Sequence, residues 1–408
     1  MNIIYISYSA PYDTVPKAGQ KVHNYYIKEL AKQKDINVKL ISFCEKDKLK
    51  YLDLEKNNIE GYIYPINKEK GFNKYREIKR GIFMLTTPNH KYAYILDRYR
   101  KKKVLEAIVR LKENNYKADL IIISFTMMML LIDDIKKYYP ESKYIANAHD
   151  VLYLNSYGKY CLEKNSFVKF IRKRRYKLLK SKEENVIPKF DYVFTLNYCD
   201  KQIINEMGQK NVSVIAPYYD DYYLESKNRK KRIIFFGAMN RPDNYLSCIW
   251  FIENVFNKLN RKDVEFYIIG GNPHESLFKY GKKDNNIKIT GFISYEEIKK
   301  ILSESMCMVV PLINGSGIKI KVLEGFSAGI PVLSNNVGMR GIPARNKVDY
   351  LHCEKAEDFI KSIEFLINNP REIEKIGKNG YCFLHENFNK RKSAELFIDI
   401  IEKVGYNE

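Results

Sequence analysis

This 408-residue sequence has no long apolar run. No stretch approaches the roughly 18 consecutive apolar residues that a membrane-spanning helix requires. The first residues lead directly into a strand pattern, Ile3–Ser7, and contain no longer apolar segment of the kind found in a secretory signal. We therefore expect no signal peptide and no transmembrane helix, and we expect a cytoplasmic protein.

Cysteine is too scattered to build a disulfide framework or a zinc site. The seven cysteines share no regular spacing; they are Cys44, Cys161, Cys199, Cys248, Cys307, Cys353 and Cys382. Their number is odd, none forms a Cys-x-x-Cys pair, and several lie within apolar runs. We therefore expect buried thiols in a reducing compartment.

Short motifs of several enzyme classes are also absent. The sequence has no Gly-x-Ser-x-Gly elbow, no His-x-x-x-His pair, and no metal cluster or Asp-x-Asp motif at a predicted strand end. Gly315-x-Gly317 lacks the third glycine of a dinucleotide fingerprint, which argues against a dehydrogenase. Aromatic motifs that stack RNA bases are missing, and the 33 tyrosines are spread along the chain. We expect no metal, no cofactor and no nucleic acid partner.

Positive charge, by contrast, is plentiful and unevenly distributed. The chain has 70 Lys and Arg against 49 Asp and Glu, a formal net charge of +21. Residues 1–200 hold 39 basic and 23 acidic residues and contribute +16, whereas the remainder contributes +5. Such a field favours anionic partners: a membrane surface, a lipid diphosphate, an acidic polysaccharide or nucleic acid. A general lysine-rich bias of the source organism is the open alternative.

Residues 169–180 are predicted to form a basic helix. Apolar residues stand at positions 170, 171, 178 and 179, and most of the others are Lys or Arg. This pattern suits a membrane interface and would attach the protein to the inner face of the membrane. A solvated helix that packs on its own domain is the alternative.

Strands and helices alternate along the whole sequence, which is typical of a doubly wound α/β fold. The predicted strands of the first series are 3–7, 38–43, 120–124, 144–148 and 192–196. Those of the second series are 232–236, 265–269, 287–290, 307–312 and 331–334. We predict two Rossmann-like domains, 1–222 and 223–387, because the chain is long enough for two separate cores. A last helix is predicted at about 390–404.

The segment from Asn314 to Val332 has the strongest functional pattern. An apolar strand ends in a loop where Gly315 and Gly317 permit a tight turn and close approach of the backbone to a ligand. A helix is then predicted over residues 318–328, and its free N–H groups and partial positive charge suit a phosphate.

Charged side chains on this helix match the rest of such a ligand. Lys319 and Lys321 add positive charge at its N-terminus, where acids would otherwise be favoured. Glu324 lies further along the helix and can accept hydrogen bonds from sugar hydroxyls. A nucleotide diphosphate sugar offers both partners.

The run G-x-G-x-K-x-K-x-L-E at 315–324, followed by G-x-P-V at 329–332, resembles the donor site of GT-B glycosyltransferases of the family 4-like group, glycosyl transferases group 1. In that family the glutamate, here Glu324, usually holds the nucleotide ribose, and the loop that includes Ser316 and Ile318 surrounds the donor. Many members carry a second glutamate at the position of Ser316, in contact with the transferred sugar. A subgroup with glycine-rich loops and Lys-x-Lys lacks that acid.

Residues 235–244 extend the resemblance, because they form a strand, a turn at Gly237 and a helix start with Pro242. In GT-B enzymes this loop supplies a basic residue to the donor diphosphate, and Arg241 stands at about that place. The usual Gly-Arg pair is missing, since Ala238 follows the glycine. An exposed arginine, or one in a salt bridge at the helix start, is the alternative.

Two further strand ends in the second half fit the same pattern. Gly271 lies in a turn at the edge where parallel strands place ligands. Phe292 and Ile293 resemble the segment that cups the nucleotide base, with the Phe292 ring packed there and the Ile293 backbone at the base edges. A core phenylalanine is the alternative.

In the first half, His149 and Asp150 end a predicted strand and resemble the His-Asp pair of the same family. There the histidine faces the transferred sugar in the cleft between the domains, and Asp150 could orient its ring by taking the Nδ1 proton. Gly19 resembles the glycine loop near the acceptor. A structural histidine and an ordinary loop glycine are the alternatives.

The resemblance implies a retaining, metal-independent glycosyltransferase, hexosyltransferase-like, with GT-B architecture: two Rossmann-like domains that face a central cleft, and a last helix (388–408) packed back on the first. Its donor would be a nucleotide sugar, and its acceptor a lipid-linked or cell-surface glycan precursor of polysaccharide biosynthesis. Arg241 and Lys321 would stabilise the leaving diphosphate, and His149 would hold the sugar. Two other classes stay open: another GT-B enzyme such as an NDP-sugar epimerase, and a non-catalytic basic scaffold on a degenerate GT-B fold.

Overall fold

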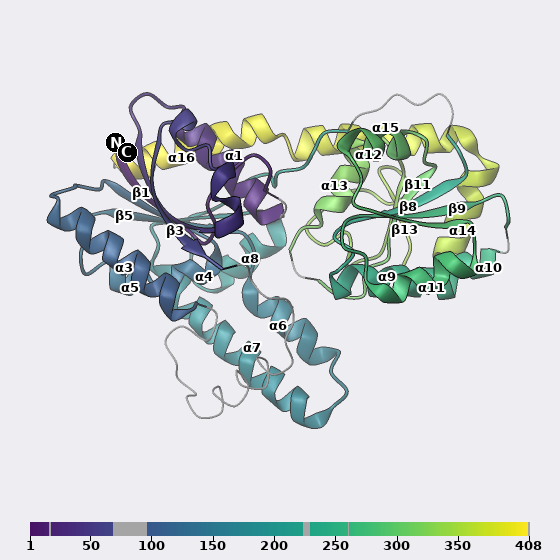
Figure 1. The fold of residues 1–408 in the computed structure, drawn as a ribbon, viewed down its shortest axis with the longest axis horizontal. Helices are drawn as coiled ribbons and strands as arrows, with labels where there is room; N and C mark the ends of the chain where they lie inside the picture. Colours follow the sequence, from purple (N-terminus) through teal and green to yellow (C-terminus); the bar gives the residue numbers. More distant parts are fainter. Residues whose placement is uncertain (16–17, 68–95, 223–228, 260, 316, 407–408) are drawn as a thin grey trace. The chain divides into compact units, whose positions relative to one another are not determined.

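The computed structural model describes residues 1–15, 18–67, 96–222, 229–259, 261–315 and 317–406 (Figure 1). The chain divides into two compact units. Unit 1 consists of residues 1–218 together with 390–408, and unit 2 consists of residues 219–389. The division after residue 218 lies close to the boundary predicted from the sequence.

Unit 1 is built on a parallel sheet with the strand order β3-β2-β1-β4-β5-β6-β7. The strands are β1 (Asn2–Ser7), β2 (Asn37–Glu45), β3 (Ile59–Ile66), β4 (Leu120–Ser124), β5 (Lys143–Ala148), β6 (Tyr192–Thr195) and β7 (Val212–Val214). All five residues of β4 are buried, as expected for a central strand of a parallel sheet that is covered on both faces.

The helices of unit 1 are α1 (Ala18–Ala31), α3 (Arg98–Glu113), α4 (Thr126–Met129), α5 (Ile132–Ile135), α6 (Leu152–Cys161), α7 (Ser166–Val186), α8 (Tyr198–Glu206) and α16 (Lys390–Tyr406). Short 3-10 helices cover Lys46–Tyr51, Glu55–Asn57 and Ile187–Lys189.

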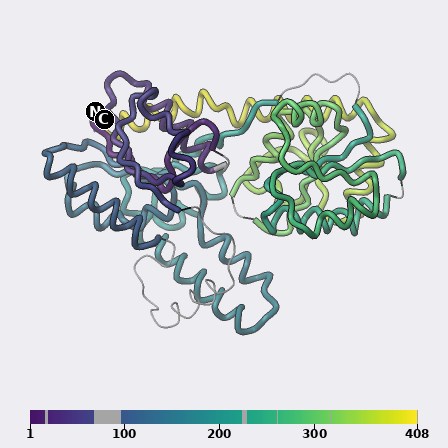
Figure 2. Tube along the Cα trace, in the orientation of Figure 1, coloured from purple at the N-terminus to yellow at the C-terminus, as the bar shows by residue number. Residues whose placement is uncertain are grey.

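Helix α16 belongs to unit 1 although 171 residues of unit 2 precede it in the sequence, and it lies beside α1 (Figure 2). The Ser393 hydroxyl accepts a hydrogen bond from the Ala216 N–H at 2.6 Å and lies 2.8 Å from the Tyr26 hydroxyl. The Phe397 ring packs against Tyr26 and Phe194, with centroids 5.0 and 4.7 Å away. These contacts make α16 part of the unit 1 core.

Unit 2 contains a second parallel sheet, with the order β10-β9-β8-β11-β12-β13. Its strands are β8 (Arg232–Phe236), β9 (Glu265–Ile269), β10 (Ile287–Gly291), β11 (Cys307–Val310), β12 (Val332–Ser334) and β13 (Leu351–His352). Its helices are α9 (Pro242–Phe251), α10 (Asn257–Leu259), α11 (Glu275–Lys283), α12 (Tyr295–Ser303), α13 (Ile320–Ser327), α14 (Ala356–Asn368) and α15 (Pro370–Asn387). A π-helical turn, Ile252–Phe256, joins α9 to α10.

Two parallel sheets with intervening helices confirm the predicted α/β fold. All ten predicted strands are present, with ends that differ by at most two residues. The strands β3, β7 and β13 were not predicted, and each lies at the edge of its sheet. An edge strand is paired on one side only and needs no continuous apolar run, which is why Glu60, Gly61 and Pro65 are tolerated in β3.

Candidate functional site

The loop that follows β11 has a backbone conformation that favours glycine. Gly315 has a φ of 151° and Gly317 a φ of 67°. A Cβ atom at Gly315 would also lie only 2.9 Å from Cε of Lys319. Both glycines are therefore needed for the path of this loop. Ser316, which stands between them, is outside the described residues.

Helix α13 begins at Ile320, two residues after the predicted start at Ile318. The difference arises because Lys319 has an extended backbone (φ −99°, ψ 97°), and its Nζ donates to the carbonyl of Gly317 at 2.6 Å. Ile318 is therefore part of the loop. The first turn of α13 has no acidic residue and no side-chain cap, so this end of the helix keeps its positive potential.

Lys321 occupies an unusual place for a lysine, because its ammonium group is held inside unit 2. Nζ donates to Oδ1 of Asn244 at 2.6 Å and lies 4.2 Å from the centre of the Phe235 ring. Burial lowers the pKa of Lys321 to about 7. The Lys321 residue as a whole is half-buried. The ring face and the amide oxygen partly replace the water that the ammonium has lost.

Gly237 and Asn244 shape the surroundings of this ammonium group. A Cβ atom at Gly237 would lie 3.0 Å from both Lys321 Nζ and Asn244 Nδ2, so only glycine leaves enough room. Asn244 is buried in the first turn of α9, and its Nδ2 donates to the carbonyl of Ala238 at 2.8 Å. One amide thus fixes the turn after β8 and the Lys321 side chain together. Asn244 is absent from the predicted site; its place in the first turn after a glycine loop is the only signal in the sequence.

Arg241 is exposed and occupies the N-cap position of α9. Its positive charge, like that of Lys319, further lowers the pKa of Lys321, whereas the charge of Glu324 opposes the shift. The structure therefore brings together the three basic residues that the sequence pattern selected. Their mutual repulsion favours an anion at this end of unit 2.

Glu324 lies about one turn into α13 and is 7% exposed. The segment 220–222 is held against the same helix: the Tyr222 N–H donates to Ser327 Oγ at 3.0 Å, and Ser327 Oγ donates to the carbonyl of Asp220 at 2.8 Å. Burial is the main cause of a raised pKa for Tyr222, and the negative charge of Glu324 adds to it. Glu324 and Tyr222 are therefore neighbours.

Gly271 and Phe292 meet at the ends of β9 and β10. A Cβ atom at Gly271 would lie 3.5 Å from the Phe292 ring, and the Gly271 carbonyl accepts the Met239 N–H at 3.2 Å. The Phe292 side chain is 91% exposed, so the alternative of a core phenylalanine is wrong. Ile293 beside it is half-buried. An exposed aromatic ring at this edge offers a flat apolar surface to a ligand.

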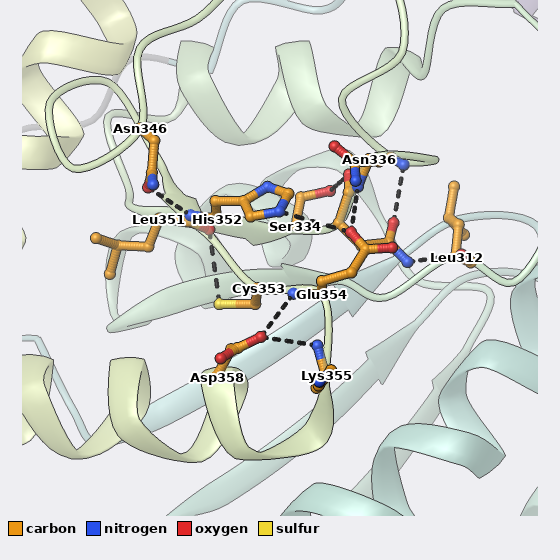
Figure 3. Close-up of polar contacts among 12 residues, drawn as sticks. Leu312, Ser334, Asn336, Asn346, Leu351, His352, Cys353, Glu354, Lys355 and Asp358 are labelled. Carbon is orange, nitrogen blue, oxygen red and sulfur yellow. Dashed lines mark hydrogen bonds and ion pairs between the residues drawn. The ribbon is translucent and has the colours of Figure 1, made fainter.

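A set of hydrogen bonds links the end of β12 to the segment after β11 and to the end of β13 (Figure 3). The Asn335 side chain donates to the carbonyl of Leu312 at 2.8 Å and accepts from the Gly338 N–H at 2.9 Å. The Asn336 N–H donates to Oε2 of Glu354 at 3.0 Å. The loop is thus tied to the neighbouring strand before its first glycine.

In unit 1, His149 follows directly on β5 and its ring is closely packed. Nε2 lies 3.1 Å from Ser124 Oγ, and the imidazole stacks on the Phe125 ring at a centroid distance of 4.2 Å and an angle of 4°. A Cβ atom at Gly19 would lie 3.5 Å from Nδ1, so these two predicted residues lie close together. Burial lowers the pKa of His149 to about 3, which keeps the ring neutral.

The predicted role of Asp150 in orienting this ring is wrong. The Nδ1 atom of His149 has no hydrogen-bond partner among the described residues. Instead the backbone carbonyl of Asp150 accepts from Thr126 Oγ1 at 2.7 Å. The orientation of the ring comes from Ser124 and Phe125.

Phe125 has a φ of +72°, a conformation that is uncommon for any residue with a side chain and costly for a bulky one. The strained residue is the one that stacks on His149. Phe125 was not predicted, because nothing in a sequence shows a positive φ at a residue other than glycine.

Two negative findings apply to the part of the chain that the structure describes. No helix there is long and apolar enough to cross a membrane. No group of three or more His, Cys, Asp or Glu side chains there is arranged to hold a metal ion.

Comparison with known proteins agrees with this architecture. Residues 230–369, which form most of unit 2, match the family described as glycosyl transferases group 1. An uncharacterized 44.6 kDa protein in the cps region of Klebsiella pneumoniae is 24% identical over 202 residues, which are 48% of this chain. The chain spans about half the length (51%) of that curated relative.

Solved structures resemble the whole chain at low sequence identity. Sucrose-phosphate synthase from Thermosynechococcus elongatus has a TM-score of 0.70 at 12% identity and covers 100% of both chains. Anabaena HepE in complex with UDP and glucose has a TM-score of 0.66 at 11% identity, with 99% of this chain and 100% of that chain covered. The chain therefore has the GT-B fold, and residues 230–369 match the glycosyl transferases group 1 family, in agreement with the predicted resemblance.

Proposed function

We propose that the protein is a glycosyltransferase that takes its sugar from a nucleotide diphosphate sugar bound by unit 2. The observation that supports this best is the convergence of Lys319, Lys321 and Arg241 beside the uncapped start of α13. Three cations and a helix N-terminus at one place suit a diphosphate. Glu324 would accept hydrogen bonds from the ribose, and Phe292 would pack against the base.

The proposed chemistry follows from where charge develops. When the glycosidic bond to the donor breaks, negative charge grows on the leaving diphosphate. Lys321 and Arg241 would stabilise that charge, and Asn244 would hold the Lys321 ammonium in position. With these groups in place we propose that no divalent metal is needed and that the anomeric configuration is retained.

Unit 1 is proposed to bind the acceptor. His149 is neutral, so it would act as a hydrogen-bonding group toward a sugar or acceptor hydroxyl and not as a cation. Gly19 lies beside its Nδ1 atom, where a Cβ atom would be in van der Waals contact with the ring. The relative from a cps region supports a lipid-linked or cell-surface glycan precursor as acceptor. A lipid-linked acceptor would lie in a membrane, and the net positive charge of residues 1–200 would attract an anionic membrane surface. Both points support a cytoplasmic enzyme that works at the inner face of the membrane.

Thermal unfolding in the presence of UDP, GDP and the other nucleoside diphosphates tests the donor site. One of them should raise the melting temperature of the wild-type protein, and the increase should be smaller in Arg241→Ala. The stabilising nucleotide then selects the sugar donors for an assay of nucleotide release with and without glycan acceptors. No stabilisation by any nucleotide would contradict the proposal. Conversion of the sugar without transfer would indicate an epimerase instead.

A further inference from the structure

Helices α6 and α7 form an antiparallel hairpin that extends away from the sheet of unit 1 (Figure 1). At its base both carboxylate oxygens of Glu183 accept hydrogen bonds at 2.8 Å, from the N–H groups of Leu152 and Tyr153. Further out, the Tyr176 ring of α7 packs against Tyr157 and Tyr160 of α6, with centroids 5.2 and 5.3 Å away. The hairpin is therefore anchored at one end and packed along its length.

The outer part of the hairpin exposes large apolar side chains. Helix α6 contains no buried residue, and α7 buries only Leu179, Glu183 and Val186, toward its base. Near the tip, Leu162, Phe167 and Phe170 are 54%, 66% and 52% exposed. Phe167 and Phe170 are three residues apart in α7, so they lie on the same side of the helix. Three such side chains together are more than the scattered exposure of a usual surface.

Basic residues are frequent in the sequence on either side of this apolar tip. Between residues 159 and 177 there are eight: Lys159, Lys164, Lys169, Arg172, Lys173, Arg174, Arg175 and Lys177. The same stretch has one acidic residue, Glu163, which forms an ion pair with Arg172 at 2.9 Å. The excess of positive charge therefore lies in the outer half of the hairpin, which also exposes Leu162, Phe167 and Phe170.

We propose that the tip of the α6–α7 hairpin inserts into the surface of an anionic lipid bilayer. Leu162, Phe167 and Phe170 would enter the boundary between headgroups and acyl chains, and the surrounding Lys and Arg would contact the anionic headgroups. The combination selects this partner: a nucleic acid would satisfy the charge and leave the apolar side chains in water. The proposal does not depend on the catalytic role of unit 2.

Co-sedimentation with vesicles tests the proposal on the full-length protein. Vesicles of phosphatidylcholine alone are compared with vesicles that also contain phosphatidylglycerol, at low and high salt. We expect binding only to the anionic vesicles, reduced at high salt. The double variant Phe167→Ser/Phe170→Ser should bind about tenfold or more weakly at the same salt concentration, because apolar insertion is lost while the charge is kept. Lys173→Glu/Lys177→Glu should lose at least as much.

Matched substitutions on unit 2 provide the controls. Phe365→Ser changes a phenylalanine that is 41% exposed, and Lys258→Glu/Lys378→Glu reverses two exposed lysines; both variants should bind vesicles like the wild type. Insertion itself is tested with Phe170→Trp, whose fluorescence should be quenched by brominated lipids more than that of the native Trp250.

Three results would overturn the proposal. One is equal binding to neutral and anionic vesicles, or none at low salt. Another is vesicle binding that the serine variants leave unchanged, since adsorption would then need charge alone. The third is concentration-dependent dimerisation that the serine variants abolish without any effect on vesicle binding, because the apolar tip would then serve a second copy of the chain.

Discussion

Binding of a nucleoside diphosphate should draw a proton onto Lys321, and this uptake can be measured directly. Without a ligand the ammonium group contacts the Asn244 amide oxygen and the Phe235 ring, and burial lowers its pKa to about 7. A diphosphate beside Nζ adds negative charge and favours the protonated form. The pKa of Lys321 should then rise again to about 10 or above.

The size of the effect follows from these two pKa values. With a pKa of about 7, Lys321 carries roughly 0.1 proton at pH 8, so binding should take up about 0.9 proton per nucleotide. For the same reason the Kd should increase about tenfold for each pH unit above 7, until the pKa of the bound state is reached. At pH 8 the terminal phosphate of UDP, with a pKa of about 6, is already ionised and contributes little.

Isothermal titration calorimetry with UDP, or with the nucleotide that stabilises the protein best, measures the uptake. At pH 8 the apparent enthalpy is plotted against the ionisation enthalpy of several buffers, and the slope gives the number of protons. Lys321→Met, which keeps the apolar stem and removes the charge, should reduce the slope to near zero. Lys300→Met, on the exposed surface of α12, serves as the control and should keep it. A zero slope in the wild type, or the wild-type slope in Lys321→Met, would refute the reasoning.

Three other predictions concern single side chains. Because folding lowers the pKa of Lys321, the unfolded chain binds more protons than the folded protein between pH 7 and 10.5. The buried charge therefore reduces the free energy of unfolding by its full amount below pH 7, and by less as the pH rises towards 10.5. The difference in the free energy of unfolding between wild type and Lys321→Met, measured with urea, should therefore become smaller from pH 7 to pH 9. A difference that does not change with pH would contradict this. Glu324→Ala should weaken nucleotide binding by about 1.5–3 kcal/mol, roughly tenfold or more, because a charged hydrogen-bond acceptor is lost; unchanged calorimetric affinity in a folded variant would remove Glu324 from the site. Phe125→Gly should have a free energy of unfolding in urea about 1–2 kcal/mol higher than that of Phe125→Ala, since glycine adopts a φ of +72° without strain. Both Phe125 variants should change the NMR shift of the His149 ring, and equal stabilities would indicate that the backbone relaxes.

The fold could be predicted well because buried parallel strands are continuous apolar runs. Each predicted strand has two neighbours or lies in a run long enough to stand out, whereas β3, β7 and β13 at the sheet edges have weaker patterns. The start of α13 could not be placed from the pattern, since the loop continues through Lys319 without any residue that marks a boundary.

For the candidate site, the sequence suggested residues but did not show the contacts among them. Glycine spacing and positive charge indicated the loop and its two lysines, but not that Lys321 would be enclosed by residues from the turn after β8, far away in the sequence. Nothing in the sequence distinguishes Asn244 from the other asparagines, because its contact with the Lys321 ammonium group depends on the fold. Likewise His149 was selected because it follows a predicted strand. Its stacking on the strained Phe125 could not be predicted, because that contact depends on backbone geometry.

The placement of α16 in unit 1 has a consequence for synthesis of the chain on the ribosome. Unit 2 is continuous in sequence, so it can fold as soon as residues 219–389 have emerged. Unit 1 cannot, because its core lacks Ser393 and Phe397 until α16 has been made, and meanwhile Tyr26 and Phe194 have no partner from that helix.

The half of the protein that is synthesised first is therefore the last to be completed. During that interval the face of unit 1 that α16 later covers is an apolar surface open to chaperones and to other nascent chains. A released chain that ends at residue 389 should contain a protease-resistant unit 2 and a protease-sensitive unit 1. Addition of a peptide with the sequence of α16 should then protect unit 1.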